Sequence, residues 1–269
     1  FSLASVPSSG VQFAASIAYL TRVSEAIEAI REERYRTETE REAFETFAAE
    51  VQELHAADDL QPNVHGVDGV AFRNSPVTKG ATSESVRVLY RETVMDVDHY
   101  EEEYDEPLRT NVSAELGSDF GTALATTTML TRPLQSALVR ASYATARDRK
   151  SFEALVESEL ESLTEAETRL RSAAETVDRV HNRNLTDQSF TDLSAQIQRL
   201  QTVERECESL IESRQTDYVD APEEDELNLK EYFYMQYEWT HPVISDALDI
   251  IREIRKTKRR IQTSAIDQL

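Results

Sequence analysis

Two long spans of the chain, residues 11–61 and 134–221, contain neither glycine nor proline. Inside a helix, glycine costs about 1 kcal/mol and proline about 3 kcal/mol relative to alanine, so spans without either favour long helices. The six glycines and seven prolines all lie in the remaining segments, where we expect turns and loops. This distribution predicts an all-α fold, an elongated helical bundle with short connections.

The first span carries apolar residues at seven-residue intervals, a spacing that returns side chains to one side of a helix. We expect one long helix from Val11 to Ala57, after a disordered start. Its middle, residues 31–42, is almost entirely charged and should project into solvent or meet a polar partner face. The heptad stripe also suits self-association with a second copy. Its members are Val23, Ile30, Thr37, Phe44 and Val51.

The second span contains two similar apolar stripes on either side of a polar turn at residues 181–189. Their seven-residue spacing is that of a coiled-coil seam. Stripes of similar length across a short turn favour an antiparallel hairpin over 134–218, with residues 134–181 packed against 188–218. Cys207, the only cysteine, lies on the second stripe, where we expect a buried, inert thiol. The stripes comprise Val156, Leu163, Leu170 and Val177 on one arm and Leu193, Leu200 and Cys207 on the other.

The segments rich in glycine and proline divide the chain into three parts. These are a long N-terminal helix over 1–57, an irregular loop over 58–82, and a helical bundle over 83–269 that includes the hairpin. The loop holds three of the six glycines and two of the seven prolines. An alternation of apolar residues within it suits either a short strand or a tethered loop. The alternating residues are Val67, Val70 and Phe72.

The bundle should begin with a helix whose body runs from Glu84 to Tyr104, followed by a short helix that starts near Pro107. Gly117 and Gly121 then punctuate a threonine-rich link that ends at Pro133. These glycines and prolines predict short helices and connections in this part of the chain, in contrast to the long spans on either side.

The C-terminal part contains an acidic linker over 217–225, an aromatic cluster over 232–239 and a final helix from Val243 onward. The cluster holds the only tryptophan of the chain. Large aromatic side chains bury much apolar surface, so we expect this cluster to cap the core where several helices converge.

The chain is strongly acidic, with 51 acidic residues against 29 basic ones and a formal net charge of −22. Only five basic residues are lysines, which leaves 29 − 5 = 24 arginines. Excess acid with few lysines is typical of proteins adapted to concentrated salt, where a Debye length of about 3 Å at 1 M screens self-repulsion. An ordinary acidic protein from a low-salt cytosol is the alternative interpretation.

The sequence contains no run of about 18 apolar residues, so we expect no transmembrane helix. Together with the charge, this favours a location in a salt-rich cytoplasm. The chain begins with Phe1 rather than methionine, which suggests a fragment or a processed product. A removed signal peptide would leave no trace in it.

The segment from Tyr90 to Pro107 reads YRETVMDVDHYEEEYDEP and continues through Asn111 and residues 114–117. This segment resembles a haloarchaeal family catalogued only as a domain of unknown function, with the strongest similarity over residues 83–117. Looser similarity covers residues 31–47, 231–234 and 242–243. The resemblance agrees with the salt-adapted composition and implies no activity, cofactor or catalytic residue.

Pairs of a carboxylate and a histidine three residues apart are the candidate metal ligands. Residues at this spacing share a helix face, and Glu-x-x-His pairs bind the metals of di-iron helical bundles. The candidates are Asp96, His99 and Glu103, then Glu238 with His241, and Asp178 with His181. With 51 acidic residues among 269, such pairs also arise by chance. A ferritin-like metal-binding bundle is therefore an alternative, and a solvated or capping role is expected for each histidine.

A basic run near the C-terminus could bind nucleic acid or an anionic membrane surface. The run comprises Arg252, Arg255, Lys256, Lys258, Arg259 and Arg260. Alternatively, these cations complement the acidic body or the end of their helix. Phosphate-driven affinity falls with a log-log slope of about −0.9 per contact, so strong salt would remove most of it. Nucleic acid is therefore an unlikely partner.

Motifs for nucleotide binding and nucleophilic catalysis are absent: the sequence holds no P-loop, no Gly-x-Gly-x-x-Gly and no nucleophile elbow. A single cysteine cannot form a zinc cage. We therefore expect no cofactor and a non-enzymatic role, with a protein partner or a second copy bound through coiled-coil faces. A nucleic-acid-associated regulator that uses the basic C-terminal helix is the alternative, besides the metal-binding bundle.

Overall fold

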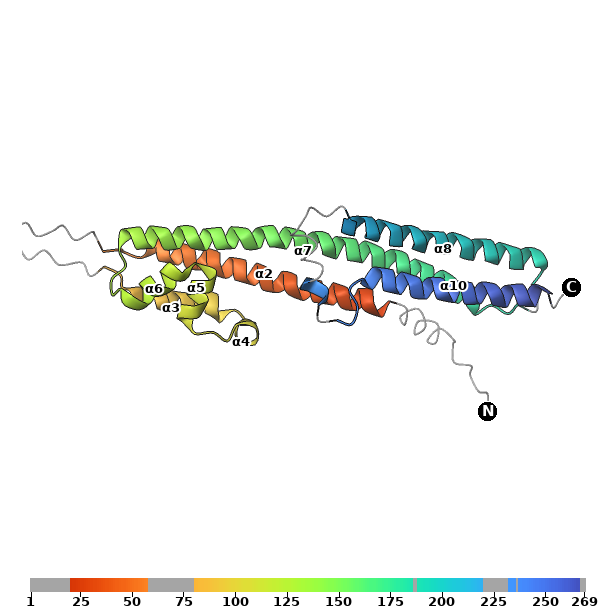
Figure 1. Cartoon of the computed structure of the whole chain (residues 1–269), viewed down its shortest axis with the longest axis horizontal. Helices are drawn as coiled ribbons and strands as arrows, with labels where there is room; N and C mark the ends of the chain where they lie inside the picture. Colours follow the sequence, from red (N-terminus) through yellow and green to blue (C-terminus); the bar gives the residue numbers. More distant parts are fainter. Residues whose placement is uncertain (1–19, 58–79, 186–187, 220–231, 236, 267–269) are drawn as a thin grey trace, which may run out of the picture. The chain divides into compact units, whose positions relative to one another are not determined.

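The computed structural model describes residues 20–57, 80–185, 188–219, 232–235 and 237–266. Over these residues the chain forms helices and no β-strand, with two isolated bridges. The all-α prediction is therefore confirmed (Figure 1). In chain order the elements are α2 (Thr21–Glu53), α3 (Ser83–Thr93), η1 (Val94–Asp96), α4 (Tyr100–Glu103), α5 (Leu108–Glu115), α6 (Ser118–Thr126), α7 (Arg132–His181), α8 (Phe190–Val219) and α10 (Pro242–Ile266).

Some predicted features fall outside the described residues. The helix expected over Val11–Ala57 corresponds to α2, which runs from Thr21 to Glu53. Residues 11–19 of the expected helix lie outside the described residues. The possible strand or tethered loop at residues 67–72 lies outside them as well. Residues 217–219 of the expected acidic linker belong to α8, which continues through Val219, and residues 220–225 of it lie outside the described part.

The chain groups into two compact units. The first unit contains the residues up to Glu32 and again from Glu157, and the second contains Glu33–Val156. Both α2 and α7 contribute one part to each unit. This grouping differs from the expected single bundle over 83–269. Neither long helix carries a glycine or proline where it passes from one unit to the other, so the sequence pattern gives no sign of the boundary.

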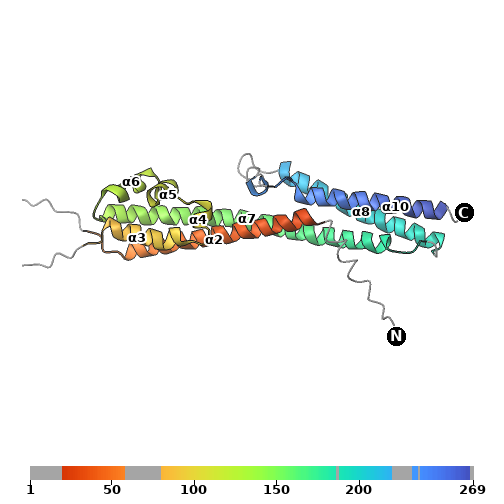
Figure 2. The same ribbon diagram turned by 90° about the horizontal axis from the view of Figure 1, so that it is seen from below.

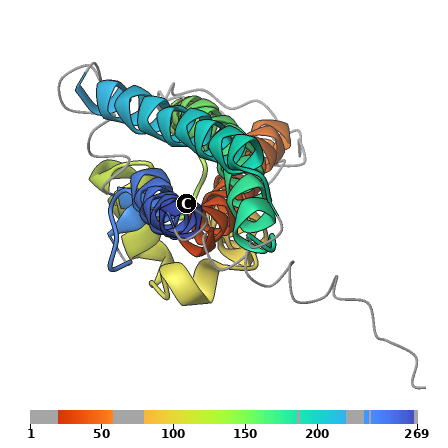
Figure 3. The same ribbon diagram turned by 90° about the vertical axis from the view of Figure 1, so that its right-hand side faces the viewer.

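In the first unit, α8 runs antiparallel to the later part of α7, and α10 packs against α8 (Figures 2 and 3). The predicted stripes are buried, since Leu163 and Leu170 of α7 and Leu193 and Leu200 of α8 are at most 1% exposed. The predicted hairpin is present, but its arms are unequal. Helix α7 has 50 residues and α8 has 30, and the part of α7 before Glu157 belongs to the second unit.

The aromatic cluster also belongs to the first unit. Phe233 and Tyr234 are buried, and the ring centroid of Trp239 lies 5.6 Å from that of Tyr234. The ring of Tyr237 stacks on Trp239 with a centroid separation of 4.3 Å. Tyr232 remains 48% exposed, so the cluster is buried on one side and open on the other.

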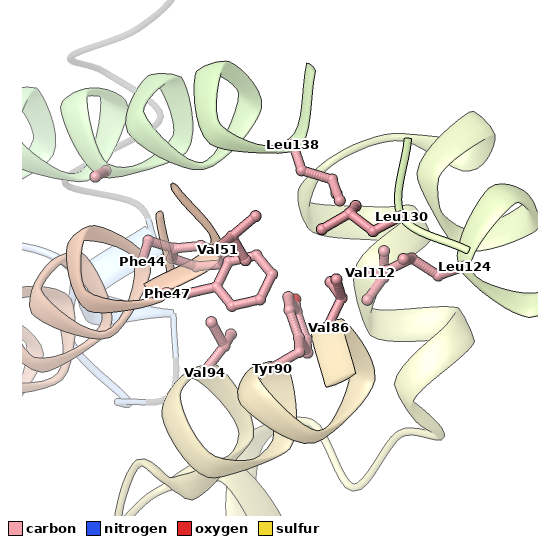
Figure 4. Close-up of a cluster of buried hydrophobic side chains, with 11 residues drawn as sticks. Phe44, Phe47, Val51, Val86, Tyr90, Val94, Val112, Leu124, Leu130 and Leu138 are labelled. Carbon is pink, nitrogen blue, oxygen red and sulfur yellow. The ribbon is translucent and has the colours of Figure 1, made fainter. Parts of the chain in front are cut away.

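The core of the second unit forms between α2, α3, α5, α6 and α7 (Figure 4). Tyr90 of α3 is fully buried in it. Its ring lies edge-on to Phe47, with centroids 5.1 Å apart. Its hydroxyl donates to Oδ1 of Asn111 at 2.7 Å, which offsets the cost of burying a polar group. The cluster also includes Phe44, Val51, Val86, Val94, Val112, Leu124, Leu130, Leu138 and Ala146.

The helix expected over 84–104 is wrong as one continuous element. It is broken into α3, η1 and α4, and Val97 takes an extended backbone between the last two. Val94 and Tyr100 are both buried. In a straight helix, residues six positions apart would lie about 120° apart around the axis, so the break helps both to face the core.

Residues 118–126, expected as part of a link, form helix α6. Gly117 precedes it with a φ of +114°, in a region that glycine adopts readily. Gly121 lies inside the helix, where a Cβ would overlap Oγ of Ser113 and stand 2.9 Å from the carbonyl oxygen of Arg109. Gly121 therefore allows α6 to approach α5 closely and does not end a helix.

Both ends of α2 are capped by side chains of other helices. At its start, Asp246 of α10 accepts a hydrogen bond from the amide of Val23 at 2.9 Å. At its end, Nε2 of Gln135 on α7 donates to the carbonyl oxygens of Val51 and Leu54 at 2.8 and 2.7 Å. Helix ends leave backbone groups unpaired, and these side chains pair several of them.

Candidate polar centre of the second unit

Residues 31–42, the charged middle of α2, show both expected outcomes, since Glu38 and Glu42 are exposed and Glu40 meets a polar face. Oε1 of Glu40 accepts a hydrogen bond from the hydroxyl of Tyr104 at 2.7 Å and lies 3.1 Å from Nε2 of His99. Oε2 of Glu40 accepts from Nε of Arg149 at 2.6 Å. We call Glu40, His99, Tyr104 and Arg149 the polar centre.

Arg149 connects the polar centre to α5 and to the core. Its Nη2 donates to Oε2 of Glu115 at 2.9 Å, and its guanidinium carbon lies 4.6 Å from the ring centroid of Phe44, within cation–π range. A cavity of about 10 Å³ lies among these side chains, which is room for about one water molecule. Small-molecule sites measure roughly 300–1,000 Å³, so the centre cannot hold an organic substrate.

The partners in the polar centre fix its charges. Burial alone would raise the pKa of Glu40, but Arg149, Tyr104 and His99 together lower it. Burial would lower the pKa of Arg149, and the carboxylates of Glu115 and Glu40 raise it. Burial and the Glu40 charge raise the pKa of Tyr104. At neutral pH the centre therefore contains a paired carboxylate and guanidinium beside a neutral phenol.

Of the predicted metal ligands, the structure brings His99 and Glu103 together but leaves Asp96 exposed on η1. Glu40 lies where Asp96 was expected. One ligand atom from each of Glu40, His99 and Glu103 lies within 4.8 Å of the others, and within the described residues no other such group of three occurs. Sequence spacing could not reveal Glu40, because it lies 59 positions from His99.

The other histidine pairs do not form such a group in the described part of the chain. Glu238 and His241 are both exposed. Asp178 is buried, and Nδ1 of His181 lies 3.3 Å from Oγ1 of Thr257 and 3.4 Å from Oε1 of Glu253.

The basic residues of α10 meet acidic partners within the first unit. Glu204 of α8 accepts from Nε of Arg255 at 2.8 Å and from Nζ of Lys258 at 2.6 Å. Burial would raise the pKa of Glu204, but these two cations lower it. This is the arrangement expected if the run complements the acidic body. Of the other members, Arg252 pairs with Asp249, Lys256 pairs with Glu253, Arg260 donates to the carbonyl of His181, and Arg259 is exposed.

A second glutamate is held in the same way in the first unit. Oε1 of Glu159 accepts from the hydroxyl of Tyr234 at 2.7 Å and from Nη2 of Arg214 at 2.8 Å. The side chains of Glu159 and Arg214 are 7% and 4% exposed. Removing one partner of such a buried pair is costly because the other charge is left uncompensated. Each unit therefore has a tyrosine–glutamate–arginine cluster that joins separate elements.

An open groove of about 570 Å³ lies between the end of α2 and α3 in the second unit. We call it the α2–α3 groove. Its apolar lining comes from Ala49, Leu54 and Leu89, and its polar lining from Glu50, Gln52, Glu53 and Glu92. No feature of the sequence singled out this surface, because its residues come from two segments that are more than 30 positions apart in the chain.

Another groove, of about 410 Å³, lies between α7 and α8 in the first unit, with Leu170 and Cys207 in its lining. Cys207 is 2% exposed, and burial raises the pKa of its thiol to about 12. The predicted buried thiol is confirmed, and at neutral pH it stays protonated and unreactive.

The described residues form an all-helical domain with polar clusters paired within each of its two units and with open surface grooves. Within these residues no set of catalytic side chains converges on one site. The chain belongs to the family described as a domain of unknown function, DUF7260, whose model matches residues 21–258. This confirms the resemblance to a family of unknown function, and the haloarchaeal origin stays a prediction. No curated protein and no solved structure matches the chain. Among the described helices, none is long and apolar enough to cross a membrane.

Proposed function

We propose that this protein is a non-enzymatic interaction protein. In this proposal the α2–α3 groove receives a positively charged amphipathic helix of a partner protein. The observation that carries the proposal is the combination of an apolar floor and an acidic rim in one open groove. Amphipathic helices bind such surfaces by placing their apolar face into the groove.

The floor of the groove is continuous with the core of the second unit. Leu54 and Leu89 are partly buried and pack against the core cluster, so their positions are fixed before a partner arrives. Ala49 is exposed beside them. A rigid apolar floor lowers the ordering cost of binding, and apolar side chains of an incoming helix would be desolvated there.

The rim of the groove carries glutamates that pair with no cation among the described residues. Glu50, Glu53 and Glu92 are exposed, and none of them forms an ion pair within the described part of the chain. By contrast, Glu40 and Glu159 are paired with arginines. Lysine or arginine residues flanking the apolar face of a partner helix would complement this rim and orient the helix.

The heptad stripe of α2 is a weaker candidate for binding a second copy. Val23, Ile30, Phe44 and Val51 are at most 1% exposed, and Thr37 is 5% exposed. The stripe therefore packs inside the chain, and a partner surface has to lie elsewhere.

The proposal can be tested with a fluorescently labelled helical peptide of leucines and lysines in amphipathic order. The test variant is E50Q/E53Q/E92Q. The matched control is E161Q/E165Q/E175Q, which neutralises three exposed glutamates of α7 in the first unit. Both change the net charge by the same amount, from −22 to −22 + 3 = −19.

Peptide affinity, measured by fluorescence anisotropy, should fall about tenfold in the test variant, because three surface pairs at about 0.5 kcal/mol each add to about 1.5 kcal/mol. The control should bind like the unsubstituted chain. Equal weakening in both variants would mean that the peptide follows net charge and not the groove. That result would overturn the proposal.

A further inference from the structure

Three atoms of metal-ligand type converge beside the polar centre. Nε2 of His99 lies 3.1 Å from Oε1 of Glu40 and 3.9 Å from Oε2 of Glu103, and all three ligand atoms lie within 4.8 Å of one another. A tetrahedral ion with bonds of about 2.1 Å separates its ligands by about 3.4 Å. The observed separations bracket that value, so a shift of about 1 Å by Glu103 would complete the geometry.

The environment of His99 gives independent support for a metal site. The His99 side chain is 5% exposed, and its Nε2 lies near the two carboxylates. Among the described residues its buried Nδ1 has no hydrogen-bond partner. Buried polar atoms are rarely left unpaired, so placing this imidazole here costs free energy. A metal ion bound at Nε2 would leave Nδ1 unpaired, but the added metal–nitrogen bond would help to hold the buried ring in place.

Hydrogen bonds already fix the carboxylate of Glu40 in the way that metal-binding carboxylates are fixed. Metal-binding carboxylates are typically fixed by further hydrogen bonds. Tyr104 and Arg149 supply them here, one to each oxygen of Glu40. If the Oε1 lone pair now facing His99 turned to a metal ion, both of these hydrogen bonds would remain.

Glu103 can reach an ion without leaving a charge unpaired. Arg36 lies 3.6 Å from both Glu102 and Glu103, so Glu102 keeps the arginine when Glu103 turns to the metal. Glu103 is 31% exposed and has room to move. Two carboxylates balance the charge of a divalent ion, and water can complete its coordination.

From this geometry we propose that Glu40, His99 and Glu103 form a binding site for one divalent transition-metal ion. Imidazole nitrogen with carboxylate oxygens is a donor set that suits Zn²⁺. The ion would tie the middle of α2 to the segment around α4, which no covalent link joins directly. Its role would be to stabilise the second unit, independently of any partner bound in the α2–α3 groove.

The test is equilibrium dialysis of the full chain against micromolar ZnCl₂ near neutral pH, with millimolar magnesium present to suppress weak binding to surface carboxylates. The unsubstituted chain should bind one zinc ion. E103Q and H99Q should each weaken zinc binding at least about tenfold. The matched control is E101Q, which removes the charge of an exposed glutamate two residues away and should bind zinc like the unsubstituted chain.

Thermal unfolding supplies a second readout that does not depend on H99Q folding well. Zinc should raise the melting temperature of the unsubstituted chain and of E101Q but not that of E103Q. Failure of the unsubstituted chain to bind zinc, or equal binding by E103Q and E101Q, would overturn the proposal.

Discussion

Asp246 accepts a 2.9 Å hydrogen bond from the backbone amide of Val23, a residue 223 positions earlier in the chain. The Asp246 side chain is fully buried, and it also accepts from Nη1 of Arg22 at 2.9 Å. The last described helix of the chain thus caps the first one. The first unit is therefore joined through contacts between residues at opposite ends of the sequence.

Replacing Asp246 should distinguish its role as a hydrogen-bond acceptor from its charge. D246A removes the cap and should lower the free energy of unfolding by about 1–3 kcal/mol. D246N keeps an acceptor oxygen and should cost less than half as much, because burial raises the pKa of Asp246 against the opposing effects of Val23 and Arg22. Urea denaturation measures both values. Equal losses in the two variants would show that charge matters more than capping.

Glu40 should be a strong contributor to the stability of the second unit. E40Q leaves Arg149 with Glu115 as its remaining carboxylate partner and weakens a charge-assisted hydrogen bond, so unfolding should become easier by about 1.5–3 kcal/mol. Glu42 lies on the same helix with a side chain that is 64% exposed. E42Q is the matched control and should change stability by less than about 0.5 kcal/mol.

The contribution of Glu40 should also depend on pH. The pKa of Glu40 is lower in the folded chain than its ordinary value, so the folded state binds fewer protons at this site than the unfolded state. Its stabilisation is therefore present above the unfolded pKa of about 4.3 and is lost as the pH falls through the folded value. The stability difference between the unsubstituted chain and E40Q should stay constant from pH 7 to about 5 and shrink below about 4.3. A difference that grows in acid would contradict the assigned direction.

Gly121 should be intolerant of alanine although it lies inside a helix. Alanine normally stabilises a helix relative to glycine by about 1 kcal/mol. In α6 the added Cβ would stand 2.9 Å from the carbonyl oxygen of Arg109, and backbone cannot move aside cheaply. G121A should therefore lower the free energy of unfolding by about 1–3 kcal/mol, which thermal denaturation can measure. A more stable variant would show that α5 and α6 are not packed this closely.

The sequence was sufficient to predict features that depend on local pattern. Pro133 and Pro242 marked the starts of α7 and α10, and the heptad spacing of Leu163, Leu170, Leu193 and Leu200 identified both arms of the hairpin. These side chains repeat along one helix face, so the pattern can be recognised without knowing the partner. The break at Val97 was missed because burial of residues on two sides of a helix leaves no distinct local signal.

The polar centre was only partly predictable, for a physical reason. His99 and Glu103 lie within one short segment and were identified from their spacing. Glu40 and Arg149 come from other helices, and glutamates and arginines are common throughout this chain. Nothing local distinguishes a glutamate that faces a buried arginine from one that faces solvent, so these partners required the tertiary fold.

The proposed interaction depends most directly on where a partner helix binds. Hydrogen exchange of the full chain, measured with and without the leucine–lysine peptide, would locate it by backbone amide protection. Binding in the α2–α3 groove should slow exchange at residues 49–54 and 88–92 and leave α8 and α10 unchanged. Protection spread evenly over the chain, or confined to the first unit, would contradict the proposed groove.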